Sequence, residues 1–343
     1  MKILGVTYFL FFVTIEALSN CLPISKIRPR LPVYIESCND LPQESKSCIE
    51  GRQLFFTNDL SSDQSISCAS CHKPNLAFTD KLKKPEARQK SLWVPRTPSL
   101  LDIHRRSAPF FWNGRAHSLT SAIFWPLHHP DELGASDETI EKFGGSHKIA
   151  KNISDFLKTL STGRAAIDDY LEGNCQALTL TERTGLRVFL ENCADCHRGT
   201  EFDGGIEEIK YKGLRKEYFQ SGEATYLAQT PLHSGFKPII SLKSKVPSLR
   251  NIEAKGPPYG RFGQGEDLEK YLEYHIWQTD RPTLISIDEL EEFLKQGLQS
   301  HSLGLFTKRT GSKTSKKARS TSSSSNRGSE GLLFRSNSGS GSK

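Results

Sequence analysis

Methionine is almost absent from this sequence, because Met1 is the only one among its 343 residues. A metal ion bound elsewhere in the chain therefore has no methionine thioether as a ligand. Long apolar runs are also scarce. The uncharged run at residues 3–15 is too short for a membrane-spanning helix, and no later run approaches that length. We therefore predict no transmembrane helix in the mature chain.

The net charge of +7 suggests a basic protein, yet most of the chain has no excess of positive charge. Residues 307–343 hold nine Lys and Arg against one Glu, a surplus of eight, so the remainder carries about −1. A nearly neutral body gives no electrostatic reason to expect nucleic acid as a partner. The Ser-rich, basic segment 305–343 buries too little apolar surface to fold, so we predict a disordered tail.

The amino-terminal end is typical of a cleaved signal peptide, predicted over residues 1–20. Lys2 precedes the uncharged run, and small and polar residues follow it up to Cys21. We therefore predict a periplasmic or secreted protein. Leu18-Ser19-Asn20-Cys21 also loosely resembles a lipoprotein cleavage site, which makes a lipid anchor at Cys21 the alternative, although Asn20 favours simple secretion.

The eight cysteines fall into two groups, of which one consists of two tight pairs. The other four are dispersed: Cys21, Cys38, Cys48 and Cys175. Export makes a disulfide between Cys38 and Cys48 feasible, but spacing does not establish connectivity. Cys175 has no obvious partner.

Hydrophobic spacing predicts a mostly α-helical fold. Residues 146–160 have an apolar stripe, Thr179 and Glu182 form a capping-box pair before another stripe, and Ser286 and Glu289 repeat that signal. Residues 21–44, rich in Pro and polar side chains, are expected to be an extended lead-in rather than a packed element. We predict two tandem helical domains, at 45–175 and 176–304.

Each predicted domain contains a Cys-x-x-Cys-His motif: Cys68-Ala69-Ser70-Cys71-His72 and Cys193-Ala194-Asp195-Cys196-His197. The cysteines supply thiols for thioether bonds to a haem, and the following imidazole reaches the iron from the same backbone turn. A zinc or redox cysteine pair is the alternative, but a His after both pairs in an exported chain favours haem. We predict two covalent c-type haems with His72 and His197 as proximal ligands. Since each motif heads a comparable unit, both predicted domains are expected to be cytochrome c-like.

The second axial ligand decides what each haem does, because an iron with a vacant position can bind a small molecule. For the second haem, Leu268, Tyr271, Leu272 and His275 follow helical spacing, which makes His275 the first choice of ligand. Tyr274, about 100° further round the helix, is the alternative.

For the first haem, helical spacing singles out no second ligand, and no His or Met occurs between Lys73 and Ile103. Four later histidines remain open as ligands, and their spacing singles none of them out: His104, His117, His128 and His129. An open or water-bound iron is therefore expected.

With these residues identified, the chain resembles the bacterial dihaem cytochrome c peroxidase and MauG family over roughly residues 45–300. The first haem motif and the following segments carry the resemblance together: Gly51-Arg52-Gln53-Leu54-Phe55-Phe56, Leu60-Ser61, Phe78-Thr79-Asp80, Arg96-Thr97-Pro98-Ser99-Leu100, Phe111-Trp112-Asn113-Gly114-Arg115-Ala116, Asp131-Glu132-Leu133-Gly134 and Val246-Pro247-Ser248-Leu249-Arg250-Asn251.

The resemblance implies that Trp112 lies between the haems and that Glu132 lies beside the peroxide-binding haem. A carboxyl group there suits O–O cleavage, which needs a proton moved between the two oxygens. Ala122 and Leu133 depart from the family's usual Gln and Met. Arg96 and, less securely, Lys255 match the family's calcium-binding positions, so we predict that calcium is absent.

The function implied is reduction of hydrogen peroxide at the first haem, with electrons from a small donor protein, a c-type cytochrome or cupredoxin, passing through the second haem. A MauG-like oxidase that modifies a partner protein is one alternative. A dihaem electron carrier without a substrate is another, and association as a homodimer stays open.

Overall fold

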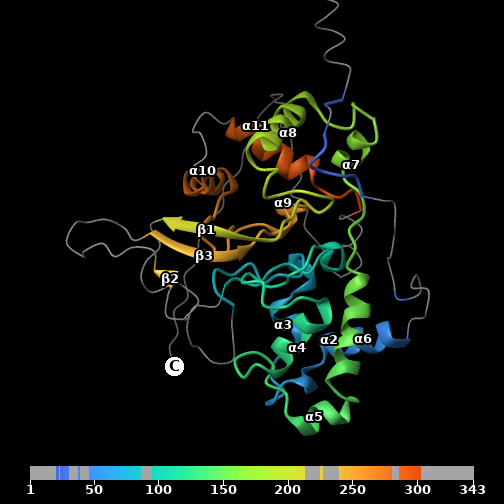
Figure 1. Cartoon of the computed structure of the whole chain (residues 1–343). Coiled ribbons are helices and arrows are strands. Elements are labelled where there is room, and N and C mark those ends of the chain that lie inside the picture. The colour runs from blue at the N-terminus through green and yellow to red at the C-terminus, as the bar shows by residue number, and fades with distance from the viewer. Residues whose placement is uncertain are drawn as a thin grey trace, which may run out of the picture. The chain divides into compact units, whose positions relative to one another are not determined.

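The computed structural model describes residues 21–22, 24–30, 38, 46–85, 95–212, 225–226, 239–279 and 286–302. Their fold is mostly helical with one small sheet, which confirms the predicted class at that level (Figure 1). The helices are α2 (Lys46–Phe56), α3 (Cys68–Cys71), α4 (Leu119–His128), α5 (Asp137–Lys142), α6 (Ser146–Lys158), α7 (Ala166–Leu171), α8 (Leu180–Asn192), α9 (Ile252–Lys255), α10 (Leu268–Gln278) and α11 (Ile287–Glu292). A π-helical turn at Phe293–Gly297 extends α11.

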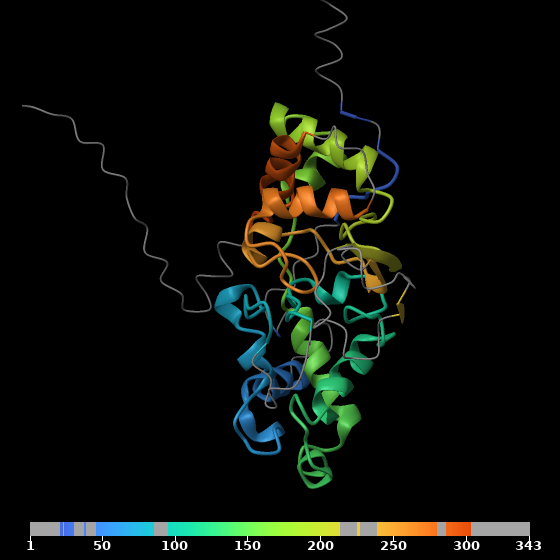
Figure 2. The same cartoon turned by 90° about the vertical axis from the view of Figure 1, so that its left-hand side faces the viewer.

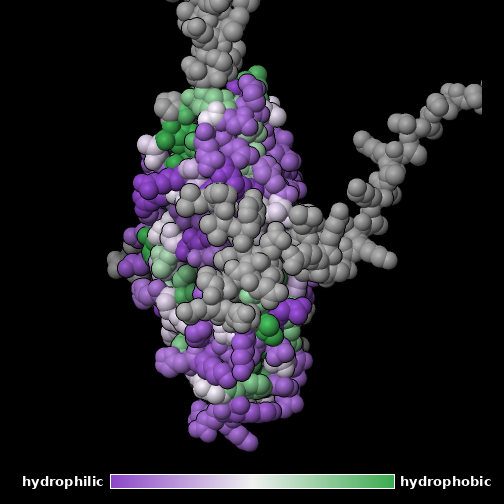
Figure 3. Space-filling model, turned by 90° about the vertical axis from the view of Figure 1, so that its right-hand side faces the viewer, coloured by the Kyte–Doolittle hydropathy of each residue, from purple (hydrophilic) through white to green (hydrophobic). Residues whose placement is uncertain are grey.

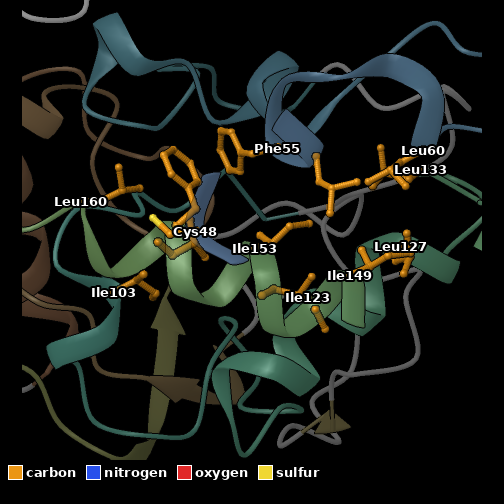
Figure 4. Packing of buried hydrophobic residues seen from close by; sticks show 14 of the residues in the cluster. Cys48, Phe55, Leu60, Ile103, Ile123, Leu127, Leu133, Ile149, Ile153 and Leu160 are labelled. Atoms are coloured by element: carbon orange, nitrogen blue, oxygen red, sulfur yellow. The ribbon is translucent and has the colours of Figure 1, made fainter. Parts of the chain in front are cut away.

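The predicted stripe at 146–160 forms α6, and its buried side chains organise the first hydrophobic cluster. This cluster contains apolar residues between Cys48 and Leu160, and Figure 4 shows them gathered along the helix. Helix α2 crosses α6 closely, since a Cβ atom at Gly51 would lie 1.8 Å from the carbonyl oxygen of Asn152. The packing of α2 on α6 thus fixes the segment that leads to the first cysteine pair.

The second hydrophobic cluster is built around α8 and α11. Thr179 caps α8 in the predicted capping box with Glu182. Gly185 permits a close helix crossing, because a Cβ atom there would lie 1.9 Å from the carbonyl oxygen of Glu289. Helix α10 packs beside α11, where Figure 2 shows the two in orange and red. This packing holds the helix that carries His275.

A three-stranded antiparallel sheet was not expected from the sequence. Its strands are β1 (Ile206–Lys212), β2 (Thr225–Tyr226) and β3 (Ile239–Lys245), in the order β1-β3-β2. Ile206 pairs with Lys245 at the end nearest the second cysteine pair. The strands are short and carry charges at several positions, so their alternation is too weak to be recognised in the sequence.

The lead-in is extended at residues 24–30, but the expectation that it is unpacked is wrong there. Ile27 is buried in the second cluster, and Arg30 is 1% exposed. The change from the first cluster to the second falls between Leu160 and Ala165. The described residues belong to one compact unit, and the division into two domains stays a prediction.

No helix in the described ranges is long and apolar enough to cross a membrane. Hydrophilic residues dominate the molecular face in Figure 3, with hydrophobic residues in small groups. The predicted signal peptide and the basic tail lie outside the described residues.

Candidate haem centres

The first cysteine pair is held on a single helical turn. Helix α3 runs from Cys68 to Cys71, and His72 follows as its C-terminal cap. The Nδ1 atom of His72 lies 3.0 Å from the carbonyl oxygen of Phe78. This contact orients the ring and leaves Nε2 available to a metal, as is usual for a ligating imidazole.

The second pair repeats this geometry at the end of α8. The His197 N–H donates to the Cys193 carbonyl over 2.9 Å, and His197 Nδ1 lies 3.1 Å from the carbonyl oxygen of Phe202. Neither motif contributes a cysteine to a disulfide. Paired thiols and an oriented imidazole on one turn are the groups that covalent haem attachment needs, so both motifs fit a c-type haem.

An internal repeat surrounds the two motifs, and the sequence reasoning missed it. Pro98-Ser99-Leu100 recurs as Pro247-Ser248-Leu249, 149 positions further on. The Ser99 hydroxyl donates to the Ala77 carbonyl over 2.6 Å, and the Ser248 hydroxyl donates to the Glu201 carbonyl over 2.7 Å. Each segment therefore makes the same contact with the loop after its own haem motif.

The same displacement of 149 positions in the sequence relates helices α4 and α10. Bridges between Phe110 and Ala116 and between Tyr259 and Gly265 form matching turns before α4 and α10. The caps of these helices, Ser118 and Asp267, are also 149 positions apart. Helix α4 is therefore the counterpart of α10 in the first half.

On α10, His275 faces the second proximal histidine. The ring centroids of His197 and His275 are 6.5 Å apart, with an angle of 68° between the rings. Two imidazoles on opposite sides of one metal, each with a metal–nitrogen bond of about 2 Å, have ring centres roughly 6 Å apart. The alternative ligand, Tyr274, packs against Trp277 at 6.0 Å. The geometry therefore fits His275 as the axial partner of His197.

The counterpart of His275 on α4 is Pro126, which lies 149 positions earlier. Proline has no side-chain atom that binds iron, so the repeat supplies no such ligand opposite His72. Of the open candidates, His128 bonds to Ser146 over 3.1 Å and His129 Nδ1 accepts the Asp131 N–H over 3.2 Å.

The other two candidates, His104 and His117, differ in burial. His117 is exposed, whereas the Nδ1 atom of His104 is buried without a hydrogen-bond partner. Burial lowers the pKa of His104 to about 4. Neither the exposure of His117 nor the burial of His104 identifies a ligand of the first haem.

Glu132 lies beside the first motif. Burial raises the pKa of its carboxyl group, and the nearby Arg115 opposes this shift. Burial is the main cause of the raised pKa of the Cys68 thiol. Glu132 is close enough to Cys68 that its carboxylate charge also contributes to this rise. The structure thus brings a partly buried acid to the cysteine pair of the first half.

Trp112 connects segments of the two halves. Its indole N–H donates to the Arg96 carbonyl over 2.9 Å, and its own carbonyl accepts the Lys245 N–H over 2.8 Å. Since Arg96 and Lys245 are counterparts in the repeat, Trp112 lies at the junction between the segments that follow the two haem motifs.

A buried network of charges also joins the halves, and no sequence signal indicated it. The guanidinium of Arg30 pairs with Asp102 at 3.1 Å and with Glu201. Arg250 donates to both carboxylate oxygens of Asp168, over 2.8 and 2.5 Å. These bidentate pairs involve residues far apart in the sequence, so only the folded chain reveals them.

We expect Asp168→Asn to destabilise the protein by about 3–5 kcal/mol, because it leaves the Arg250 guanidinium buried without a counter-charge. Asp169→Asn is the matched control, since Asp169 is 38% exposed in its pair with Arg164 and should lose about 1 kcal/mol or less. Urea denaturation measures both. Equal losses in the two variants would contradict a dominant role for the buried pair.

The same network predicts acid sensitivity. Burial favours the neutral acid, but Arg250 lowers the pKa of Asp168, and Arg30 lowers that of Asp102 to about 2. A carboxyl whose pKa falls on folding contributes stability above its unfolded pKa of about 3.9 and loses it as the pH falls through the folded pKa. Stability should therefore decline between roughly pH 4 and pH 2.

Two disulfides complete the framework: Cys21–Cys175 and Cys38–Cys48. The Cys38–Cys48 bond agrees with the pairing that the sequence made feasible. The Cys21–Cys175 bond corrects the expectation that Cys175 has no obvious partner. Because a lipid anchor at Cys21 would need the same sulfur atom, the Cys21–Cys175 bond argues against that alternative.

Comparisons with known proteins find chains that are similar to this one. Residues 48–144 match the family model described as di-haem cytochrome c peroxidase. The methylamine utilization protein MauG of Methylorubrum extorquens is 28% identical over 286 residues, which cover 77% of this chain and 78% of the relative. The cytochrome c551 peroxidase of Nitrosomonas europaea is 28% identical over 252 residues, or 68% of this chain and 73% of the relative.

A solved structure shows a similar fold. It is a MauG-like protein associated with microbial copper homeostasis, with a TM-score of 0.59, 23% sequence identity, and coverage of 82% of this chain and 95% of the other. The family of these relatives implies two c-type haems. The resemblance seen in the sequence is thereby confirmed: this chain is similar to the di-haem cytochrome c peroxidases and the MauG proteins.

Proposed function

We propose that this protein reduces hydrogen peroxide at the haem site of His72, with electrons that enter through the haem site of His197. When bound, the two haems supply the redox chemistry, and the protein supplies ligands, orientation and a proton path. The chain's own residues determine which of the two sites admits peroxide.

The contrast between His275 and Pro126 carries this proposal. His275 faces His197 at a centroid distance of 6.5 Å, which suits a site closed by two imidazoles. The equivalent position on α4 is Pro126, which leaves the side opposite His72 without an equivalent ligand. One site is therefore suited to electron transfer and the other to binding a small molecule.

Glu132 moves the proton in this proposal. Cleavage of the peroxide O–O bond requires a proton to pass from one oxygen to the departing one, so that water leaves. A carboxylate that accepts and then returns this proton works best when its pKa is near the working pH. Burial raises the pKa of Glu132 toward that range.

Trp112 provides the connection between the two sites. Its indole and its backbone bond to counterpart segments of the two halves, at Arg96 and Lys245. We infer that this side chain lies on the route that electrons follow from the second site to the first. The external donor is a small protein, either a c-type cytochrome or a cupredoxin.

Turnover tests the proposal directly. The purified holoprotein should oxidise reduced c-type cytochrome or cupredoxin in proportion to added peroxide, with two donor electrons consumed for each peroxide. Donor oxidation that does not depend on peroxide would contradict it.

A MauG-like oxidase is the second candidate. His275 as a ligand favours it, because a nitrogen donor suits higher oxidation states of iron better than a thioether does. This function predicts a peroxide-dependent chemical change in a co-expressed partner protein, detectable by mass spectrometry, with little turnover of reduced cytochrome.

We also propose that the protein works without calcium. The positions that resemble the family's calcium site hold Arg96, which is 8% exposed, and Lys255, whose ammonium donates to the Ser248 carbonyl over 3.0 Å. Activity should therefore be unchanged after treatment with a calcium chelator. Activity that is lost on chelation and restored by calcium would refute this proposal.

Export to an oxidising compartment agrees with the two disulfides in the described residues. We therefore propose a periplasmic or secreted protein released by cleavage of residues 1–20. Mass spectrometry of the mature amino terminus tests this, since an acylated Cys21 would contradict simple secretion.

A further inference from the structure

The internal repeat pairs four cationic residues whose charges take no part in the reaction proposed above. The shift of 149 positions relates Arg96 to Lys245 and Arg106 to Lys255. Their backbones make equivalent bonds across the junction, because the Arg96 N–H donates to the Arg261 carbonyl and the Lys245 N–H donates to the Trp112 carbonyl. Each half therefore contributes a matching pair of cations to this junction.

Two of these cations, Arg106 and Lys255, have no carboxylate partner within the described residues. Arg106 donates from Nη2 to the Leu101 carbonyl over 2.5 Å, while its Nε is buried without a partner. Lys255 donates from Nζ to the Ser248 carbonyl over 3.0 Å. Carbonyl oxygens solvate a cation but do not neutralise its charge.

The surrounding carboxylates are already committed to other cations. Asp102 and Glu201 pair with Arg30, and Asp168 pairs with Arg250. Asp203 accepts from Lys245 at 3.2 Å. Among the described residues, carboxylates therefore act as counter-ions to these other cations but not to Arg106 and Lys255.

The two cations are also near each other and near the first haem motif. Burial is the main reason that the pKa of Lys255 is well below its usual value, and the Arg106 charge contributes. Each cation is also bonded next to its own haem motif. Arg106 bonds to Leu101, and the N–H of the preceding Leu100 donates to the Phe78 carbonyl that orients His72. Lys255 bonds to Ser248, and the N–H of the following Leu249 donates to the Phe202 carbonyl that orients His197. Like charges held together in a partly buried place are costly, so this arrangement calls for a bound anion.

We propose that Arg106 and Lys255 bind the propionate carboxylates of the haems, Arg106 those of the haem at His72 and Lys255 those of the haem at His197. This inference rests on the haem content of the proposed function, but not on its reaction with peroxide. A guanidinium matches a carboxylate with two parallel hydrogen bonds, and an ammonium offers three donors. The cofactor would thus complete the charge balance of the junction.

Each cation should then set the redox properties of its own haem. A positive charge beside a propionate favours the reduced iron, because the ferric centre carries one more positive charge. Removing that charge should lower the reduction equilibrium constant of the affected haem about tenfold, which corresponds to about 59 mV for one electron.

The test compares Arg106→Leu and Lys255→Met in the full-length holoprotein, with Arg106→Lys as the charge-preserving variant. The exposed Lys148 provides the matched control Lys148→Met, which removes one positive charge outside the junction. Resonance Raman spectra report the propionate bending bands, and spectroelectrochemistry reports the two potentials. Neither measurement requires peroxide, so a failed peroxidase function would not affect it.

We expect shifted propionate bands and a lowered potential of the first haem in Arg106→Leu, and of the second haem in Lys255→Met. Arg106→Lys and Lys148→Met should keep the potentials of the unmodified protein. If Arg106→Leu does not accumulate with haem, the bands and potentials of Lys255→Met and Arg106→Lys test the proposal without it. Bands and potentials unchanged in Lys255→Met, or shifted as much in Lys148→Met, would overturn the proposal.

Discussion

Replacing Pro126 with histidine should nearly abolish the reaction with peroxide. Pro126 occupies on α4 the position that His275 occupies on α10, so an imidazole there would lie opposite His72. If the new ligand leaves about 1% of the protein with an open site, the rate constant for peroxide should fall about a hundredfold. Stopped-flow mixing of the holoprotein with peroxide measures this rate.

Pro126→Ala is the matched control, because it removes the ring without adding a ligand. It should keep the reaction with peroxide within a few-fold of the unmodified protein. The proposed open site would be contradicted if Pro126→His reacted with peroxide at an unchanged rate and had the same electronic spectrum as Pro126→Ala.

Replacing Glu132 with glutamine should lower the peroxide rate by about 10²- to 10⁴-fold, the usual contribution of a positioned acid or base. The amide has nearly the same shape but does not accept and return a proton. Because burial raises the pKa of Glu132, the acid limb of the rate profile should lie above the range of an exposed glutamate, and it should disappear in the variant. Steady-state assays across pH measure both effects.

The exposed Glu138 provides the control Glu138→Gln, which should leave the rate unchanged. Reduction and reoxidation by small redox reagents should be the same in all three proteins. A Glu132→Gln variant with normal peroxide kinetics would contradict the proposed role of Glu132. If the protein is an electron carrier without a substrate, neither it nor the variant turns over peroxide, and both are reduced and reoxidised alike.

Sequence patterns predicted the strongly periodic helices well. The stripe at 146–160 became α6, and the Thr179–Glu182 capping box begins α8. Both signals are local, since each depends on residues within a few turns of one another. The small sheet was missed, because β1 and β3 carry charges at several positions and their pairing joins distant segments.

The haem motifs could be predicted because covalent attachment requires five consecutive residues. The axial partner was harder to identify, since His275 and Tyr274 differ only by their position around one helix. The ring of His275 lies 6.5 Å from that of His197, which favours His275 over Tyr274.

The sequence also contains a signal for the open first site. Pro98-Ser99-Leu100 and Pro247-Ser248-Leu249 mark the repeat that relates Pro126 to His275. Three residues are too few to establish a repeat without the matching hydrogen bonds. The buried pairs of Arg30 and Arg250 left no local pattern, because their partners Asp102, Asp168 and Glu201 come from three separate segments of the chain.

Electron paramagnetic resonance and absorption spectra of the ferric holoprotein, with and without peroxide, test the central claim most directly. The account predicts one six-coordinate, low-spin haem with two imidazole ligands and one haem with an open or water-bound position that responds to peroxide. Two six-coordinate, low-spin haems that stay unchanged by peroxide, even after partial reduction, would contradict it.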